Sequence, residues 1–414
     1  MHPYTIIQVS DSSDFSIYNL PYGVYSERGG ERHICTALGD YVVDILALDA
    51  LGKLAGTGID GLQNSLISPN LNDFIALGPA AWAALRLRLI AILSNPANEN
   101  AAWHNEVFRP MSGCEMHLPV KIPNYTDFYS SEYHATNVGA MFRPDNPLMP
   151  NWKHLPVAYH GRASSIVVSG HGVHRPSGQT LAAGEEKPRF GPSKMLDYEL
   201  ETAFIVGVPN AIGSPVAVDD AENHIFGMVL LNDWSARDIQ AWEYQPLGPF
   251  LAKNFCSTIS PWVVTMEALM PYRQPMPTHE PALLPYLQGG AHHHQYDICL
   301  EVDIEAVDGS DTTVCQTNQK YLYWTMAQQL AHHTATGCNM EVGDLLGSGT
   351  ISGPTPDSLG CLLETTKRGK NPVMLSNGET RGFLQKGDTV VMRGYAERGG
   401  KRVGFGECRG TITG

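Results

Sequence analysis

The segment richest in chemical information places two acids side by side on one predicted strand. Polar and apolar residues alternate from Lys194 to Val206, so Glu199 and Glu201 project from the same face. That face continues into apolar residues such as Ala203, and a buried carboxylate needs a positive partner because an unpaired buried charge is costly. Two acids on a solvated strand edge would need no positive partner. The pattern therefore indicates a positively charged partner, with a bound cation among the candidates.

Two further acids come from separate segments of the chain. Asp233 ends the apolar run 226–233, which is typical of a buried strand, and Asp127 lies in the stretch 124–129. If acids from three segments converge, their hard oxygen atoms suit Ca²⁺ or Mg²⁺. Acidic residues are mostly exposed, so spacing alone leaves open the alternative that each is a surface acid or a local cap.

Polar side chains that could bind an anionic ligand follow Asp233. The stretch Ser235–Asp238 has the form of a capping box and predicts the start of a helix. Arg237, Gln240 and Tyr244 then share one helix face, and a guanidinium, an amide and a phenol together suit an oxygen-rich anion. A solvent-exposed helix face could carry the same residues. Lys253 stands alone in an apolar run, which is unusual because buried lysines are rare unless they are paired.

The elements that must position these groups are mainly strands. The chain has 41 Gly and 28 Pro among 414 residues, and such frequent punctuation is typical of a β-rich protein. We expect a small N-terminal β domain over residues 1–118, with a helix after Pro79, and a larger β-rich domain over residues 119–414. The clearest strands of the larger domain are predicted at Val157–Gly161, Ser165–Ser169, Leu196–Val206, Ile225–Asn232, Trp262–Thr265, Tyr296–Ala306 and Thr389–Arg393.

One late helix is predicted over Tyr321–His333, with Gly337 as its stop signal. The stretch Glu280–Gln295 is predicted to be a surface loop, and its tract His292–His294 a solvated tract, because adjacent side chains do not converge on a ligand. For the same reason the pair His332–His333 is interpreted as a surface or interface pair.

Composition excludes several classes of partner and location. The formal net charge is −14, and without a run of Lys or Arg we expect no nucleic-acid or anionic-membrane partner. The eight cysteines include no CxxC pair, which favours free thiols in a reducing compartment. The first residues lack a signal-peptide pattern, and charges interrupt the apolar stretch 75–93, so the sequence predicts a cytoplasmic protein.

Five longer motifs resemble signature stretches of the fumarylacetoacetate hydrolase family. These motifs are Asn124–Ser131, His134–Gly139, Leu155–Ser165, Asn232–Gln240 and Gly347–Pro354. The likeness runs from about Phe15 through Gly406 and includes the N-terminal domain, which shorter members of the superfamily usually lack. It implies a mainly β, α+β fold in which a small SH3-like N-terminal barrel precedes a mixed β-roll catalytic domain, and it implies a homodimer.

The resemblance also implies a metal centre with Ca²⁺ or Mg²⁺ as its cofactor. Its ligands would be Asp127, Glu199, Glu201 and Asp233. A second ion is implied near Asp233, Lys253 and Ser257. An ammonium group cannot ligate a metal, so the backbone carbonyl of Lys253 would serve there. Ser257 stands where the family has Thr, and both residues offer a hydroxyl and a carbonyl oxygen.

The implied reaction is hydrolysis of the carbon–carbon bond of 4-fumarylacetoacetate, the last step of tyrosine and phenylalanine breakdown through homogentisate. His134, oriented by Glu364, would take a proton from the attacking water, and Glu364 lies in the strand-like run Leu359–Glu364. The groups implied to receive the developing negative charge are Lys253, Arg237 and Gln240. The implied substrate-contacting residues are Tyr129, Arg143, Tyr159, Gln240, Tyr244 and Thr350.

Two alternatives stay open. The same acid-bearing strand could serve another chemistry of the superfamily, namely acylpyruvate hydrolysis or hydration of a keto-enol acid. The chain could also be a catalytically inactive metal-binding homologue, although intact His134, Glu364 and Lys253 argue against this. No GxSxG nucleophile motif is present, so water activated by His134 is the stronger hypothesis.

Overall fold

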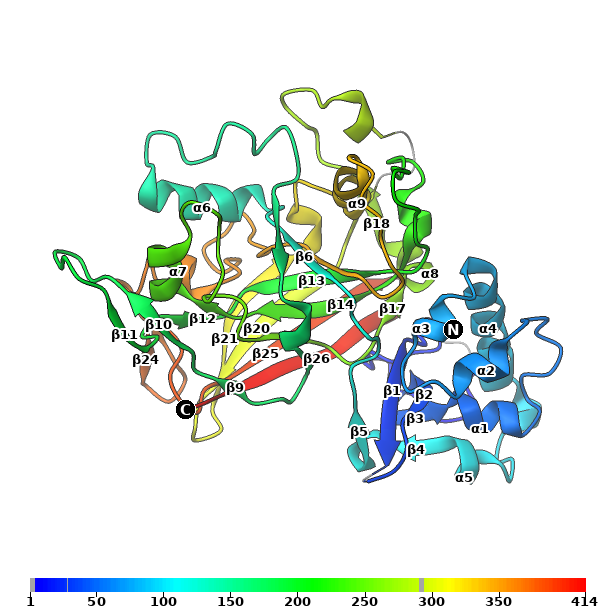
Figure 1. The fold of residues 1–414 in the computed structure, drawn as a ribbon. Helices are drawn as coiled ribbons and strands as arrows, with labels where there is room; N and C mark the ends of the chain where they lie inside the picture. The colour runs from blue at the N-terminus through cyan, green and yellow to red at the C-terminus, as the bar shows by residue number, and fades with distance from the viewer. Residues whose placement is uncertain (1–3, 28, 290–293) are drawn as a thin grey trace.

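The computed structural model describes residues 4–27, 29–289 and 294–414. Two β-rich units pack against each other, the N-terminal one in blue and cyan beside a larger unit in green to red (Figure 1). The predicted mainly β, α+β fold is confirmed. The prediction for His292 and His293 lies outside the described residues, whereas His294 begins a short strand that pairs with Pro275, so the predicted loop ends before residue 294.

The N-terminal unit is a curled sheet of five antiparallel strands in the order β4–β3–β2–β1–β5. Its strands are β1 (Tyr22–Glu27), β2 (His33–Leu38), β3 (Tyr41–Asp44), β4 (Phe108–Pro110) and β5 (Cys114–Met116). Its helices are α1 (Ile45–Ala50), α2 (Leu62–Leu66), α3 (Asn72–Ile75), α4 (Pro79–Leu93) and α5 (His104–Val107). Helix α4 is the one predicted after Pro79, and proline is well suited to the first helical position because its missing N–H would be unpaired there anyway.

The larger unit contains an eight-stranded mixed sheet in the order β7–β6–β22–β13–β14–β16–β8, and β17 also pairs with β14. These strands are β6 (Tyr125–Phe128), β7 (Ala158–Gly161), β8 (Ile166–Val168), β13 (Leu200–Val206), β14 (Ile225–Asp233), β16 (Ser257–Ile259), β17 (Val264–Thr265) and β22 (Leu345–Gly347). Strand β22 is parallel to β6 and antiparallel to β13, so a late segment of the chain separates two earlier ones.

A second sheet of five strands has the order β21–β20–β25–β26–β9. It consists of β9 (Val173–His174), β20 (Cys299–Glu305), β21 (Asp311–Asn318), β25 (Thr389–Arg398) and β26 (Lys401–Thr413). Phe204 of β13 packs into the core that this sheet shares with the eight-stranded one, whereas Ile205 packs into the core shared with the N-terminal unit. Each such fully buried side chain contributes about 1.5–3 kcal/mol, so both faces of β13 hold the acid-bearing strand in place.

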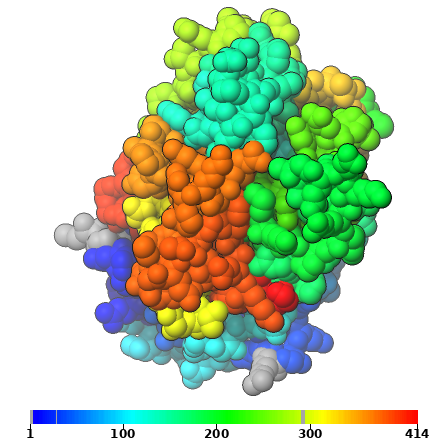
Figure 2. Space-filling view, turned by 90° about the vertical axis from the view of Figure 1, so that its left-hand side faces the viewer, coloured from blue at the N-terminus to red at the C-terminus, as the bar shows by residue number. Residues whose placement is uncertain are grey.

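Shorter elements complete the larger unit. The two-stranded ladders are β10 (Ser177–Thr180) with β11 (Arg189–Pro192), β12 (Leu196–Asp197) with β15 (Ser235–Ala236), β18 (Arg273–Pro275) with β19 (His294–Tyr296), and β23 (Val373–Met374) with β24 (Thr380–Arg381). The helices are α6 (Glu132–Phe142), α7 (Arg237–Glu243), α8 (Met266–Leu269), α9 (Met326–Thr334) and α10 (Leu362–Thr365). Figure 2 shows the green β10–β11 region and the orange segment after β22 meeting on one face. Leu196 of β12, which follows β11, accepts a hydrogen bond through its carbonyl from the Leu384 amide at 2.9 Å.

Four local predictions are wrong, two about the extent of an element and two about local structure near the acids. Helix α9 begins at Met326 rather than Tyr321, because Thr325 and Gln328 form a capping box. The strand expected over Leu196–Val206 breaks into β12 and β13, and the Glu199 amide in the gap donates to the Asn232 side chain at 3.2 Å.

The other two errors concern helix starts near the acids. Ser235 forms no capping box, because its hydroxyl donates to the Asp233 carbonyl at 3.2 Å, and Asp238 instead accepts from Ser193 at 2.6 Å. The strand-like run Leu359–Glu364 contains the short helix α10.

All eight cysteines are free thiols. Among the described residues, no helix has the length and apolar character that a bilayer crossing requires.

Candidate active site

Four buried carboxylates from distant segments converge at one end of the eight-stranded sheet. Asp127 lies on β6, Glu201 on β13 and Asp233 at the end of β14. Glu199 immediately precedes β13. One oxygen atom from each of the four lies within 4.8 Å of the others, and all four residues are buried. The structure thus brings together the four acids that the resemblance names as metal ligands.

Two cations neutralise one side of this acid cluster, which we define as Asp127, Glu199, Glu201 and Asp233. Lys253 Nζ donates to Glu199 Oε2 at 2.5 Å and to Asp233 Oδ2 at 2.7 Å. Arg237 Nη1 donates to Glu199 Oε1 at 2.5 Å. Burial opposes the ionisation of Glu199, but Lys253, Arg237 and His134 hold its pKa well below the usual range. Burial likewise opposes the charged form of Lys253, yet Asp233 and Glu199 raise its pKa.

The other side of the acid cluster contains carboxylate oxygens without a hydrogen-bond partner. Among the described residues, Asp127 Oδ1 and Glu201 Oε1 are buried and have no hydrogen-bond partner. Burial raises the pKa of both carboxyl groups well above their usual values, and the neighbouring acids raise it further. Buried carboxylate oxygens without partners are costly, and a hard divalent cation is the partner that they fit.

The backbone beside these oxygens leaves room for a ligand. A Cβ atom at Gly347 would lie 2.8 Å from Asp127 Oδ1 and 2.9 Å from Glu201 Oε2, so only glycine fits between the two acids. Two residues later, the Gly349 amide donates to Glu201 Oε2 at 3.0 Å. The residues present therefore fit a divalent cation at the acid cluster.

When EDTA keeps divalent cations away from the acid cluster, the stability of the protein should depend on pH through Asp127 and Glu201. The folded-state pKa values of Asp127 and Glu201 are raised, so the folded state holds protons that the unfolded state releases, and stability falls as pH rises. We expect the melting temperature in EDTA to decline as the pH rises, over a window that begins near the unfolded pKa of about 4 for these acids. Glu201→Gln should flatten the decline, and a melting temperature that rises over this window in EDTA would contradict the assignment.

A histidine–glutamate pair adjoins the acid cluster. His134 lies in α6, where its amide donates to the N-cap residue Ser131 at 3.2 Å, and its Nδ1 lies 2.5 Å from Glu364 Oε2. Burial opposes the ionisation of Glu364, but His134 lowers the pKa of this carboxyl. With Nδ1 held by the carboxylate, Nε2 is the nitrogen available to accept a proton from water. This arrangement suits a general base.

Three further donors fix Glu364, and the sequence did not single them out. Asn137 Nδ2 donates to Oε1 at 2.9 Å, Ser352 Oγ donates to Oε2 at 2.8 Å, and Cys361 Sγ lies 3.3 Å from Oε2. Asn137 follows His134 by three residues, so helix periodicity could have placed both on one face. Ser352 carries no such signal. His134, Cys361 and Glu364 could geometrically ligate a metal, but their mutual hydrogen bonds identify an orienting network instead.

Several expected site residues contact these two groups. Tyr159 donates to Asp233 Oδ2 at 2.9 Å, and Ser257 donates to Asp233 Oδ1 at 3.0 Å. The Gln240 amide oxygen accepts from Arg237 Nη1 at 3.3 Å. The Tyr129 ring lies edge-on to His134 at 5.2 Å between ring centroids. Thr350 is buried and follows Gly349 in the chain.

Two expected substrate-contacting residues stand apart from the acid cluster. Arg143 is exposed at the end of α6 and donates to the Pro147 carbonyl at 3.1 Å. Tyr244 is 41% exposed and accepts a hydrogen bond from Gln245 at 3.2 Å. Their roles in binding substrate remain predictions.

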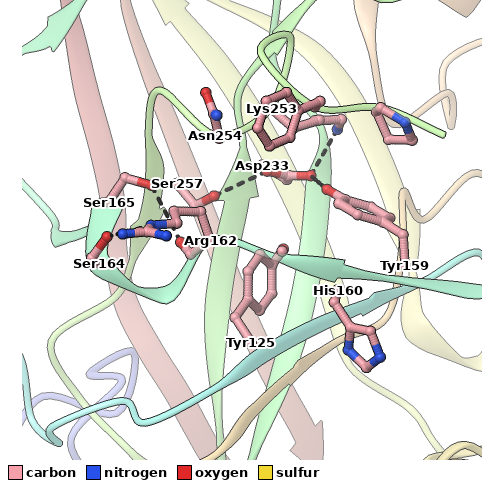
Figure 3. A pocket seen from close by; sticks show the side chains of 13 residues that line it. Tyr125, Tyr159, His160, Arg162, Ser164, Ser165, Asp233, Lys253, Asn254 and Ser257 are labelled. Carbon is pink, nitrogen blue, oxygen red and sulfur yellow. Dashed lines mark hydrogen bonds and ion pairs between the residues drawn. The ribbon is translucent and has the colours of Figure 1, made fainter. Parts of the chain in front are cut away.

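A pocket of about 430 Å³ opens at the Asp233 end of the acid cluster (Figure 3). Asp233, Lys253 and Ser257 line it together with Tyr159, all of them joined by the hydrogen bonds drawn. Its lining does not include His134, so it reaches the acid cluster from the Asp233 side.

Comparisons with known proteins agree with this geometry. The model of the fumarylacetoacetate hydrolase C-terminal family matches residues 124–413, and the fumarylacetoacetase N-terminal model matches residues 18–119. The chain is 50% identical to the fumarylacetoacetase of Bos taurus over 416 residues, covering 99% of this chain and 98% of that protein. It is 49% identical to the fumarylacetoacetase of Homo sapiens with the same coverage.

A solved structure supports the fold. A fumarylacetoacetate hydrolase from Exiguobacterium antarcticum superposes with a TM-score of 0.54 at 16% identity, covering 95% of this chain and 99% of that chain. Similarity at this level of identity concerns the fold alone, whereas the two family models together span nearly the whole sequence. The chain therefore belongs to the fumarylacetoacetate hydrolase family.

Proposed function

We propose that this protein hydrolyses the carbon–carbon bond of 4-fumarylacetoacetate to fumarate and acetoacetate, the last step of tyrosine and phenylalanine breakdown. The observation that carries the proposal is the buried His134–Glu364 pair beside a buried acid cluster with unpartnered oxygens. Full-length relatives at about 50% identity that are named fumarylacetoacetase support this substrate. They do not favour acylpyruvate hydrolysis, keto-enol acid hydration or an inactive homologue.

The proton moves through His134. Nε2 accepts a proton as a water molecule adds to the substrate carbonyl, and Glu364 stabilises the imidazolium that results. The carbon–carbon bond then breaks, and its electron pair leaves with the acetoacetate fragment as an enolate. The imidazolium returns its proton to that fragment, so one water is consumed and two acids are released. No redox partner is required.

Three donors next to the acid cluster are suited to the developing negative charge. Lys253 is buried and held by two carboxylates, and Arg237 and Gln240 are joined by a hydrogen bond. Because these groups are fixed before substrate arrives, they stabilise charge without reorganising, and removal of one such donor typically costs about 3 kcal/mol in the barrier.

We assign the divalent cation to Asp127, Glu199, Glu201 and Asp233, and propose Ca²⁺ or Mg²⁺ because all four donors are carboxylates. A bound cation would supply Lewis-acid polarisation of the substrate carbonyls. A second ion near Asp233 would use the Lys253 carbonyl and Ser257, whose hydroxyl already lies 3.0 Å from Asp233.

The domain boundary, the compartment, the oligomeric state and the partners of the protein are also part of the proposal. We place the domain boundary after residue 118, since β5 of the first sheet ends at Met116 and β6 of the next begins at Tyr125. We propose a cytoplasmic homodimer that acts on a small diketo diacid and has no nucleic-acid or membrane partner. Eight free thiols and a net charge of −14 support the compartment and the partner class.

The test is turnover of defined diketo acids by the metal-loaded protein. We expect loss of the diketone absorbance of 4-fumarylacetoacetate, with fumarate and acetoacetate appearing in equal amounts. An acylpyruvate and a keto-enol acid serve as comparison substrates and should react far more slowly. If the protein releases no fumarate, or turns over a comparison substrate faster, the proposed substrate is wrong.

A further inference from the structure

Asp197 is a buried acid that the proposed mechanism does not use. It is 0% exposed and ends β12, whose partner strand β15 leads directly into Arg237. Its carboxylate accepts four hydrogen bonds, two on each oxygen. One comes from its neighbour Tyr198, and the other three come from two segments that lie 40 or more residues away. A fully satisfied buried carboxylate of this kind fixes the segments that it joins.

The first segment held by Asp197 is the helix that carries Glu364. The Leu362 amide donates to Oδ1 at 2.8 Å, and the Leu363 amide donates to Oδ2 at 2.9 Å. These amides open α10, whose N-cap residue supplies no side-chain cap. The first amides of a helix have no partner within it, so a carboxylate that accepts from both sets the position of the whole turn. Asp197 thereby locates the partner of His134.

The second segment is the start of α7. Arg237 Nε donates to Asp197 Oδ2 at 2.9 Å, while Nη1 of the same guanidinium donates to Glu199 Oε1 at 2.5 Å. The remaining nitrogen, Nη2, is buried and has no hydrogen-bond partner among the described residues. A planar guanidinium held at two of its nitrogens cannot rotate, so the direction of this spare donor is fixed.

We infer that Asp197 is a positioning residue, which aligns the His134–Glu364 pair with Arg237 at the acid cluster by holding both through one carboxylate. Both groups act on the same substrate in the proposed function, on which this inference rests. Their relative placement matters because a misplacement of about 1 Å can cost about 100-fold in rate. No other described residue accepts hydrogen bonds from both α10 and Arg237.

The test is Asp197→Asn in the metal-loaded, full-length protein. The amide keeps the size of the side chain but turns one acceptor oxygen into a donor that faces other donors. We expect kcat to fall by about 10- to 100-fold with KM changed much less, since alignment rather than binding is lost. Ca²⁺ affinity measured by calorimetry should stay within about threefold, because no metal ligand is removed. Asp197→Glu keeps the charge and should recover part of the lost kcat.

The matched control is Asp388→Asn. Asp388 is also 0% exposed, and it accepts from Arg381 Nε at 2.8 Å, from Nη2 at 3.0 Å and from the Gln385 amide at 2.8 Å. Its substitution should cost comparable stability and leave kcat unchanged. A purely structural role of Asp197 predicts equal kinetic effects at the two positions.

The outcomes separate this inference from the proposed function. If wild type turns over the diketo acid and Asp197→Asn matches Asp388→Asn in kcat, the inference is overturned and the function stands. If wild type is inactive, the function fails, and a crystal structure of Asp197→Asn decides the inference: unmoved Glu364 and Arg237 overturn it. If neither Asp197 variant folds while Asp388→Asn does, Asp197 serves folding, and the inference is again overturned.

Discussion

His134→Ala is expected to lower kcat for the diketo acid by about 10²- to 10⁴-fold, the range typical of a lost general acid–base group. The imidazole is held by Glu364 at 2.5 Å, so its removal takes away the group that accepts the proton from water. His134 is not a member of the acid cluster, and affinity for Ca²⁺ should therefore stay near that of wild type. Steady-state kinetics and calorimetry measure the two effects separately.

The matched control is His33→Ala in the N-terminal unit. His33 Nδ1 lies 2.7 Å from Asp44 Oδ2, so this residue also forms a histidine–carboxylate pair, in the curled sheet. Its loss should leave kcat unchanged. A kcat close to wild type in His134→Ala, or an equal loss in both variants, would remove His134 as the base.

Glu201→Gln is expected to weaken binding of the divalent cation by more than about 100-fold. Groups that merely support a metal ligand are typically worth about 10- to 100-fold in affinity, and Glu201 offers an unpartnered oxygen of its own. The glutamine has nearly the same size, so the loss reports charge and ligation rather than packing. Turnover at subsaturating metal should fall in parallel and recover at high metal concentration.

Asp303→Asn provides the comparison for Glu201→Gln. Asp303 is also buried, but it lies on β20 in the second sheet, where it pairs with Arg393 and accepts from Thr313 at 2.6 Å. Its substitution should leave the affinity for the cation unchanged. Equal calorimetric affinities in Glu201→Gln and wild type would show that the acid cluster does not hold the metal.

The placement of Glu201 could be predicted from the sequence because its environment is local and periodic, whereas the set of four acids was implied only by the family resemblance. Glu201 shares a face with Ala203 and Ile205, and both of these pack into the core beneath the N-terminal unit, as alternation requires. Glu199 was assigned to the same continuous strand, but the strand is interrupted before Leu200. The interruption depends on Asn232, a partner 33 residues away, which no local pattern reveals.

Short elements near the site could not be predicted for the same reason. Helix α10 has only four residues, too few for a periodic pattern, and Asp197 holds its first amides from 165 residues earlier in the chain. Ser235 matched a capping box by spacing, yet its hydroxyl donates to the preceding Asp233 carbonyl. Asn137 and Ser352 support Glu364 only because α6, α10 and the loop after β22 meet in three dimensions.

The position of β22 sets an order of events during synthesis of the chain. This strand, Leu345–Gly347, lies between β6 and β13 and spaces their acids, although all four acids are translated more than 100 residues earlier. The curled N-terminal sheet can close once residue 116 has left the ribosome. On the proposed metal assignment, by contrast, the binding site of the cation is complete only when residues beyond 345 have emerged, so metal uptake would follow nearly complete translation.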